Sequence, residues 1–248
     1  MTNADRQMRL DRRLVEIGAF DARTRAQAAV RAGLVRVDGV RAMKPSQMVG
    51  ADARLSVEGE VHPYVSRGGV KLTAALEAFA VDPRGKICLD LGASTGGFTD
   101  VLLRRGAAKV FAVDVGGGQL HSKISSDRRV VSLEKTHAKN LSRTLVPEAI
   151  DLVVCDVSFI SLKKALPPAL ALCGAPAHVV ALIKPQFELG PEKIGKGGLV
   201  RASDEEMRAL VGEIRRWFED QGWQVIGATD SPILGGDGNR EFLIAASR

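Results

Sequence analysis

Residues 90 to 100 read Asp90-Leu91-Gly92-Ala93-Ser94-Thr95-Gly96-Gly97-Phe98-Thr99-Asp100. The run before them, Lys86-Ile87-Cys88-Leu89, predicts a buried strand, and the pattern from 98 to 105 predicts a helix. The glycines therefore fall at a strand-to-helix turn, which is where open α/β sheets bind ligands. Bare glycine backbone lets a ligand approach closely, and the free N–H groups that open the following helix favour its anionic groups.

The spacing of these glycines limits the choice of ligand. A dinucleotide fingerprint needs G-x-G-x-x-G and a phosphate-binding P-loop needs Gly-Lys-Ser/Thr, and the turn has neither. Its D-x-G-x-x-x-G-G pattern resembles the S-adenosylmethionine (SAM) motif of class I methyltransferases. Taken by itself, the turn still allows another nucleotide site or a purely structural role. The resemblance assigns these turn residues to the cofactor: Asp90, Gly92, Ala93, Ser94, Thr95, Gly96, Gly97 and Phe98.

Composition predicts a soluble globular protein with one large or two unequal domains. The chain has 248 residues, of which 45% are hydrophobic. It begins with polar residues, and no stretch approaches the roughly 18 apolar residues of a membrane helix, so we expect a cytoplasmic protein with no membrane partner. The three cysteines are far apart in apolar runs, which predicts buried free thiols, and the four histidines lack metal-ligand spacing. We therefore expect no metal.

Positive charge is concentrated at the start of the chain. The net charge is +6, and residues 1–45 hold ten Lys and Arg against five acids, so they carry +5 of it. This distribution predicts a polyanionic partner. An ordinary solvated helix face is the alternative interpretation.

Two short helices and a hairpin are predicted in this basic region. Leu10, Leu14 and Ile17 recur at helical spacing and should face a core. A second helix should be capped by Thr24, and Asp38-Gly39 is typical of a tight hairpin turn.

The same region resembles a known RNA-binding module. Arg9-Leu10-Asp11, Thr24-Arg25-x-x-Ala28 and Gly33-Leu34-Val35-x-Val37-Asp38-Gly39 are similar to the αL motif shared by ribosomal protein S4 and pseudouridine synthases. Charge alone does not distinguish RNA from DNA, but the resemblance implies structured RNA. It assigns phosphate contacts to Arg9, Arg12, Arg13, Arg25, Arg31 and Lys44, to which we add Arg67 from the next domain.

The rest of the chain alternates strands and helices. Pro63 interrupts the pattern, so we expect an RNA-binding domain at 1–60, a linker at 61–66 and a second domain at 67–248. Ser203 and Glu206 form the capping-box pattern of a helix over 203–221. The alternation predicts an α/β, Rossmann-like fold with a seven-stranded, mostly parallel sheet, in which the last two strands are antiparallel. Strands are expected at 86–90, 109–114, 130–134, 150–156, 178–184, 223–229 and 241–246.

Charged residues end several of the predicted strands. Asp114 follows the second strand, where an acid reaches the ribose of a bound nucleoside, although a simple loop acid is the alternative. Asp156 and Lys184 end the fourth and fifth strands. A lysine there is easily desolvated, which lowers an amine pKa from about 10.4 and lets it accept a proton. The alternative is a structural ion pair between the two.

Four charged residues carry a second resemblance. Lys71, Asp156, Lys184 and Glu241 match, in order and local context, the catalytic tetrad of FtsJ-like ribose 2′-O-methyltransferases. Together with the basic module, nearly the whole chain resembles the TlyA family of ribosomal RNA cytidine 2′-O-methyltransferases, which are often labelled hemolysins. The resemblance implies that Lys184 orients or deprotonates the acceptor hydroxyl. It implies cofactor contacts from Asp114, Val115, Thr136 and Asp156 as well as from the turn.

The sequence departs from the family pattern near the cofactor site. It has Glu134-Lys135-Thr136-His137 where Glu-Arg-Thr-Asn is usual, and Gly117 where an aromatic residue is common. The chain stops soon after its last predicted strand, which favours the type that modifies the large ribosomal subunit. Two alternative functions remain, a ribosome assembly factor with weak or no catalysis and a membrane-active hemolysin. A dehydrogenase is disfavoured by the missing G-x-G.

Overall fold

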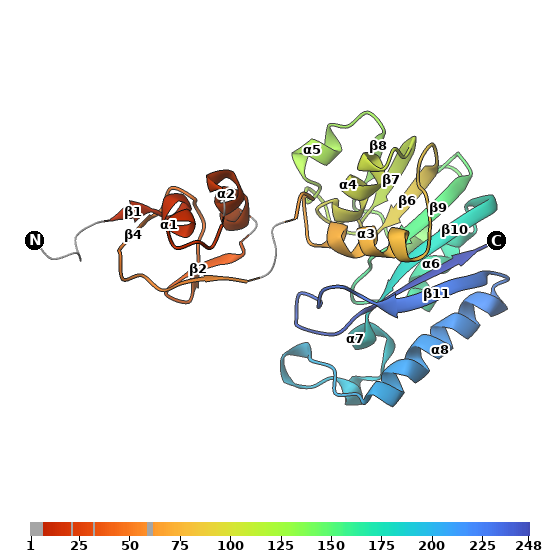
Figure 1. Ribbon diagram of the computed structural model, residues 1–248. Coiled ribbons are helices and arrows are strands. Elements are labelled where there is room, and N and C mark those ends of the chain that lie inside the picture. Colours follow the sequence, from red (N-terminus) through yellow and green to blue (C-terminus); the bar gives the residue numbers. More distant parts are fainter. Residues whose placement is uncertain (1–6, 21, 32, 59–61) are drawn as a thin grey trace, which may run out of the picture. The chain divides into compact units, whose positions relative to one another are not determined.

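The computed structural model describes residues 7–20, 22–31, 33–58 and 62–248. The chain divides into two compact units, Met1–Pro63 and Tyr64–Arg248 (Figure 1). Of the expected linker at 61–66, residue 61 lies outside the described residues. Each unit is considered by itself below.

The N-terminal unit packs two helices against short strands. Leu10, Leu14 and Val30 are among the buried residues of its core. One small sheet has the order β3-β2-β5, and β1 pairs with β4. The elements are β1 (Met8–Arg9), α1 (Leu10–Glu16), α2 (Arg23–Arg31), β2 (Val35–Val37), β3 (Val40–Arg41), β4 (Met48–Val49) and β5 (Leu55–Val57).

Three local predictions meet different outcomes in this unit. The hairpin is confirmed, since Asp38 and Gly39 both have positive φ between paired strands β2 and β3. The inward orientation of Ile17 is wrong: α1 ends at Glu16, and Ile17 is 47% exposed just beyond it. Thr24 is not a cap, because α2 already includes Arg23. Helical periodicity locates the middle of a helix better than its ends.

The larger unit contains the predicted seven-stranded sheet. Its strand order is β11-β12-β10-β9-β6-β7-β8. Neighbouring strands are parallel except that β12 runs antiparallel to both β10 and β11. The antiparallel pairing of the last two strands, β11 and β12, is the one that the sequence predicted. The strands are β6 (Ile87–Leu91), β7 (Lys109–Val113), β8 (Val130–Leu133), β9 (Ile150–Cys155), β10 (Cys173–Ile183), β11 (Gln224–Asp230) and β12 (Phe242–Ser247).

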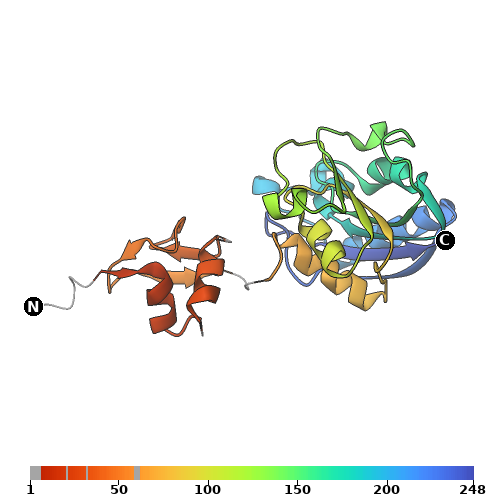
Figure 2. The same cartoon turned by 90° about the horizontal axis from the view of Figure 1, so that it is seen from above.

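Helices cover both faces of this sheet (Figure 2). Side chains alternate along the strands: Leu152 belongs to the core beneath α3 (Gly68–Ala78) and α4 (Gly97–Arg104), while Val153 belongs to the core on the other face. That second face is covered by α6 (Leu162–Leu170) and α8 (Asp204–Asp220). Burial on both faces explains why the strands are apolar runs and not alternating patterns. The remaining short helices are α5 (Ser122–Ser125), α7 (Pro185–Glu188), η2 (Ala138–Asn140), η3 (Pro191–Lys193) and η4 (Lys196–Gly198).

Strand β10 begins at Cys173, five residues before its predicted start at 178. The sequence did not predict the first part of this strand, because Gly174 and Pro176 are typical strand breakers. The pairing of β10 with β9 is irregular between Cys173 and His178, so the early part adds little to the regular ladder. The capping box on α8 is confirmed. None of the helices that the structure describes is long and apolar enough to cross a membrane.

Candidate active site

The glycine-rich turn links the central strand β6 to α4. Gly92 and Gly96 have φ of +85° and +92°, a region that favours glycine. A Cβ at Gly92 would lie 2.7 Å from the carbonyl oxygen of Asp156, so the turn packs directly against the end of β9. The turn therefore lies where the strand order reverses on either side of β6, which is the usual ligand crevice of an open α/β sheet.

Asp114 holds two loops together at the end of β7. Its Oδ2 accepts a hydrogen bond from the backbone N–H of Ser94 at 2.8 Å, and its Oδ1 accepts one from Gly116 at 2.7 Å. Glu134, beyond β8, accepts a hydrogen bond from the backbone N–H of Gln119 at 3.0 Å. Backbone hydrogen bonds from Gly118, then from Gln119 and Leu120, lower the pKa of Glu134. The two carboxylates fix the rim of the crevice before any ligand arrives.

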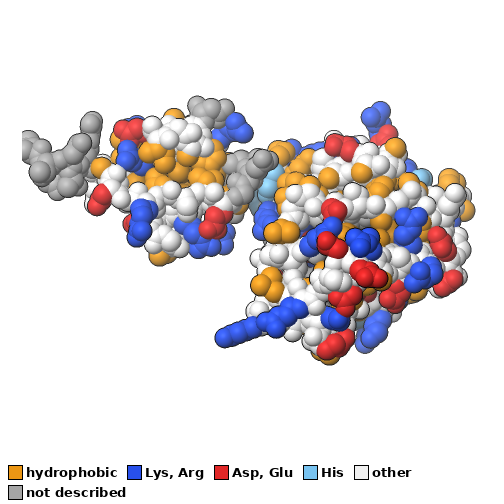
Figure 3. Space-filling view, turned by 60° about the horizontal axis from the view of Figure 1, so that its bottom comes forward, with side chains coloured by type: hydrophobic (Ala, Val, Ile, Leu, Met, Phe, Trp, Pro, Cys, Tyr) orange, Lys and Arg blue, Asp and Glu red, His pale blue; other side chains and the backbone are white. Residues whose placement is uncertain are grey.

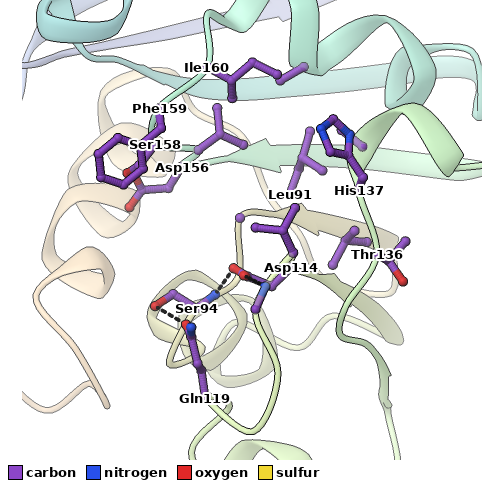
Figure 4. A pocket seen from close by; sticks show the side chains of 17 residues that line it. Leu91, Ser94, Asp114, Gln119, Thr136, His137, Asp156, Ser158, Phe159 and Ile160 are labelled. Carbon is purple, nitrogen blue, oxygen red and sulfur yellow. Dashed lines mark hydrogen bonds between the residues drawn. The ribbon is translucent and has the colours of Figure 1, made fainter.

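A pocket of about 650 Å³ opens beside this turn (Figure 4). Six of the predicted cofactor residues line it, namely Gly92, Ser94, Asp114, Val115, Thr136 and Asp156. The pocket is also lined by residues to which the sequence assigned no role: Leu91, Val113, Gly116, Gln119, His137, Ala138, Val157, Ser158, Phe159, Ile160 and Ala165. The other predicted turn residues do not line it, namely Asp90, Ala93, Thr95, Gly96, Gly97 and Phe98.

Asp90 supports the turn from within the core. It is fully buried, and its Oδ2 accepts a hydrogen bond from Thr99 at 2.6 Å. Its Oδ1 has no hydrogen-bond partner within the described part of the chain. Burial raises the pKa of Asp90 to about 7, against the opposing hydrogen bond from Thr99. Asp90 therefore acts on the turn from behind and not from the pocket wall.

Asp90→Asn is expected to flatten the pH dependence of stability. An unfolded aspartate titrates near pH ~3.9 and the folded one near 7, so the folded protein binds more protons between these values. The free energy of unfolding therefore falls as pH rises through this window, by up to roughly 4 kcal/mol. Urea titrations at about pH 5 and about pH 8 should show a smaller fall for Asp90→Asn. If the unfolding free energy of Asp90→Asn falls as much as that of the wild type, the pH dependence does not come from Asp90. The same holds if the exposed control Asp237→Asn reduces the fall as much as Asp90→Asn does.

The four residues of the predicted tetrad form two ion pairs. Lys71, on α3, donates a hydrogen bond to Glu241, and both side chains are almost completely buried. Lys184 Nζ lies 2.6 Å from Asp156 Oδ1 and donates a hydrogen bond to Ser158 Oγ at 2.9 Å. The structural ion pair considered as an alternative is therefore present, and it lies at the pocket.

Strand registers bring these two pairs to one edge of the sheet. Ile183 pairs with Phe242, so Lys184 and Glu241 are the next residues on neighbouring strands. Asp156 follows β9, which is parallel to β10, and so reaches the same edge. Because β12 is antiparallel, its first residues lie at the carboxyl ends of the other strands.

Phe159 is the most exposed large apolar side chain near the site. Its exposed fraction is 91%, and its φ of +64° is unusual for a bulky residue. Its ring lies 5.1 Å from that of Phe187. Strained backbone is retained mostly at functional sites. No sequence pattern could have shown this exposure, because an apolar residue after a strand is ordinarily buried.

In the N-terminal unit, a buried acid fixes part of the basic surface. Asp11 accepts hydrogen bonds from Arg9, Arg23 and Gln27, and these hydrogen bonds, Arg9 first among them, hold the pKa of Asp11 well below its usual range. Arg13 is bound to Glu16 and to the carbonyl of Ala51. Of the predicted phosphate contacts, Arg9 and Arg13 are therefore already engaged inside the unit, and Arg23 was not among the residues predicted to have a role.

Other predicted RNA contacts are exposed. Arg12, Arg31 and Lys44 form no side-chain hydrogen bond or ion pair with any residue that the structure describes. Arg25 is also exposed on α2. Arg67, in the larger unit, donates to the carbonyl of Leu234 at 2.6 Å. In Figure 3 basic side chains, with a few acidic ones among them, border an apolar patch on the N-terminal unit, and charges of both signs are also interspersed on the larger unit.

The pocket suits SAM in shape and chemistry. Its volume lies in the range of small-molecule sites. Asp114 presents carboxylate oxygens suited to a ribose diol, and apolar side chains such as Val115 and Ile160 suit a base. Within the described ranges, no three His, Cys, Asp or Glu residues are grouped to hold a metal ion. All three cysteines are free and buried, as predicted.

This sheet order, with a glycine-rich turn at its centre and a pocket at the strand ends, defines a class I methyltransferase. A family model for FtsJ-like methyltransferases matches residues 64–248, and one for the S4 domain matches residues 8–55. The chain belongs to the FtsJ-like methyltransferases, within the TlyA family that adds an S4 domain.

Similar proteins support this membership over most of the chain. The 16S/23S rRNA (cytidine-2′-O)-methyltransferase TlyA of Mycobacterium tuberculosis is 44% identical, over 96% of this chain and 89% of the relative. Hemolysin A of Brachyspira hyodysenteriae is 40% identical, over 95% and 98%. A solved structure described as a hemolysin from Streptococcus thermophilus has a TM-score of 0.75 at 39% identity, over 98% and 88%. The enzyme class and the use of SAM that the sequence predicted follow from the family.

Proposed function

We propose that this protein transfers a methyl group from SAM to the 2′-hydroxyl of a cytidine ribose in ribosomal RNA. The observation that supports the proposal is that two lysine–acid pairs lie at one edge of the sheet, and that Asp156 of one pair lines the pocket. The names of two TlyA relatives both include 23S rRNA, which supports the large subunit as the target. Action on ribosomes implies a cytoplasmic protein.

SAM, when bound, supplies a methyl group activated by a positively charged sulfur. The protein must then align the acceptor oxygen and remove one proton. Lys184 is suited to both tasks, because its hydrogen bond to Ser158 can be exchanged for one to the ribose hydroxyl. Asp156 keeps Nζ in place while Lys184 orients the hydroxyl or takes up its proton. The buried Lys71–Glu241 pair positions the adjoining strand end.

Phe159→Ala is expected to lower methylation of RNA by roughly 5- to 100-fold, because an aromatic platform contributes about 1–3 kcal/mol per stacked base. The ring is almost fully exposed, so unfolding free energy should change by less than about 1 kcal/mol. Kinetics on ribosomal subunits measures methylation, and calorimetry with SAM measures cofactor binding. Phe159→Trp should retain most activity. Full activity of Phe159→Ala would contradict the stacking role.

The proposed function is tested by mapping 2′-O-methyl groups on ribosomal RNA from cells with and without this protein. A cytidine mark that disappears and is restored by the purified protein with SAM supports the proposal. Wild-type protein that binds SAM and RNA but restores no mark would favour the assembly-factor alternative. Leakage from liposomes at protein concentrations that leave RNA unmethylated would favour the membrane-active alternative suggested by the hemolysin names.

A further inference from the structure

His137 lies on the pocket wall in a single defined tautomer. It follows β8 in extended conformation and caps η2, with Nδ1 accepting a hydrogen bond from the backbone N–H of Lys139 at 3.2 Å. A backbone N–H can only donate, so Nδ1 carries no proton in this arrangement. The neutral imidazole must therefore carry its proton on Nε2, which is left as a hydrogen-bond donor.

His137 shares its pocket with several apolar side chains. Ala138, Ile160 and Ala165 line the same pocket as His137. In the view of Figure 4, His137 and Ile160 lie across the pocket from Ser94 and Gln119, with Asp114 between them. An apolar slot with one directed donor suits a flat heteroaromatic ring that has an acceptor nitrogen on its edge.

The proposed function identifies that ring, and the inference rests on it. If Asp114 takes the ribose of SAM, the methionine end lies toward the glycine-rich turn and the adenine lies toward the apolar slot. We propose that His137 Nε2–H donates a hydrogen bond to a ring nitrogen of the adenine. Because Nδ1 is already used by Lys139, His137 cannot also accept from the adenine amino group.

This arrangement gives a reason for one departure from the family pattern. An asparagine offers both a donor and an acceptor, whereas the capped His137 offers a donor alone. The base is then recognised through a ring nitrogen and not through its amino group. His137 is therefore a specificity-determining residue of the proposed cofactor site.

Calorimetry with S-adenosylhomocysteine tests the contact without catalysis. His137→Ser keeps a side chain that caps a helix and removes the donor, so affinity should fall about 2- to 10-fold. His121→Ala is the matched control, because His121 caps α5 through the same type of contact to Lys123 but is outside the pocket lining. Its affinity should equal that of the wild type.

Analogues of S-adenosylhomocysteine that lack one adenine ring nitrogen identify the acceptor. One of the 1-deaza, 3-deaza and 7-deaza analogues should bind the wild type more weakly than S-adenosylhomocysteine does. The loss of affinity should equal the loss that His137→Ser causes for S-adenosylhomocysteine itself. The same analogue should bind His137→Ser with the same affinity as it binds the wild type. Long-range nitrogen–proton NMR should place the His137 proton on Nε2.

The inference fails if His137→Ser binds as tightly as the wild type, if no analogue shows this non-additivity, or if the proton lies on Nδ1. Wild-type protein that binds neither SAM nor S-adenosylhomocysteine would instead overturn the proposed function. The two failures are therefore distinct.

Discussion

Lys184→Arg is expected to reduce methyl transfer by about 10²- to 10⁴-fold while leaving SAM affinity within about threefold of the wild type. Arginine preserves the ion pair with Asp156, so the fold and the charge of the site are retained. It remains protonated at all accessible pH values, so it cannot accept the hydroxyl proton. Incorporation of labelled methyl groups into ribosomal RNA measures transfer, and calorimetry measures SAM binding.

The matched control for this change is Lys163→Arg. Lys163, on α6, forms a solvent-facing ion pair with Glu213 on α8 and does not line the pocket, so the same substitution should leave transfer unchanged. Transfer by Lys184→Arg within about tenfold of the wild type would show that Lys184 only orients the acceptor, because orientation alone survives a change that keeps the donor.

Replacing Arg12, Arg31 and Lys44 together by alanine is expected to weaken RNA binding and to make the affinity less dependent on salt concentration. These side chains have no partner among the described residues, so their loss should not destabilise the N-terminal unit. Each phosphate contact contributes about −0.7 to −0.9 to the slope of log affinity against log salt. The slope should therefore become less steep by about 2 to 3. Filter binding to ribosomal RNA at several salt concentrations measures it.

A second triple variant tests whether position matters as well as charge. Arg84, Lys164 and Arg208 are exposed residues of the larger unit, and replacing them removes the same charge. If both triple variants change the slope equally, RNA is attracted by net charge and not by the S4-type surface. SAM affinity should be unaffected in both.

The sequence predicted the sheet well because buried parallel strands are apolar runs separated by helical patterns. It also identified Asp156 and Lys184, which are charged where apolar runs stop, whereas Glu241 was singled out only by the resemblance to a family. It missed β1 and β4, because two-residue strands have no periodicity. It placed helix ends poorly, as Ile17 and Thr24 show.

The pocket wall was harder to predict than the tetrad. Motif matching assigned eight residues of the glycine-rich stretch to the cofactor, but the structure places two of them, Asp90 and Phe98, inside the core. A motif marks residues that a site needs without separating those that touch the ligand from those that support the turn. The proposed role of His137 depends on its tautomer, and that of Phe159 depends on its exposure. Neither property can be read from a sequence pattern.

The reversed direction of β12 has a consequence for folding during synthesis. This strand lies between β10 and β11 but follows both in the chain, and Glu241, the ion-pair partner of Lys71, immediately precedes it. A nascent chain extended only through β11 has already emerged with its glycine-rich turn, yet it has a gap in the sheet and no partner for Lys71. Synthesis from the N-terminus thus delivers the RNA-binding unit first and the complete active site last. On a translating ribosome, the ability to hold RNA precedes the ability to modify it.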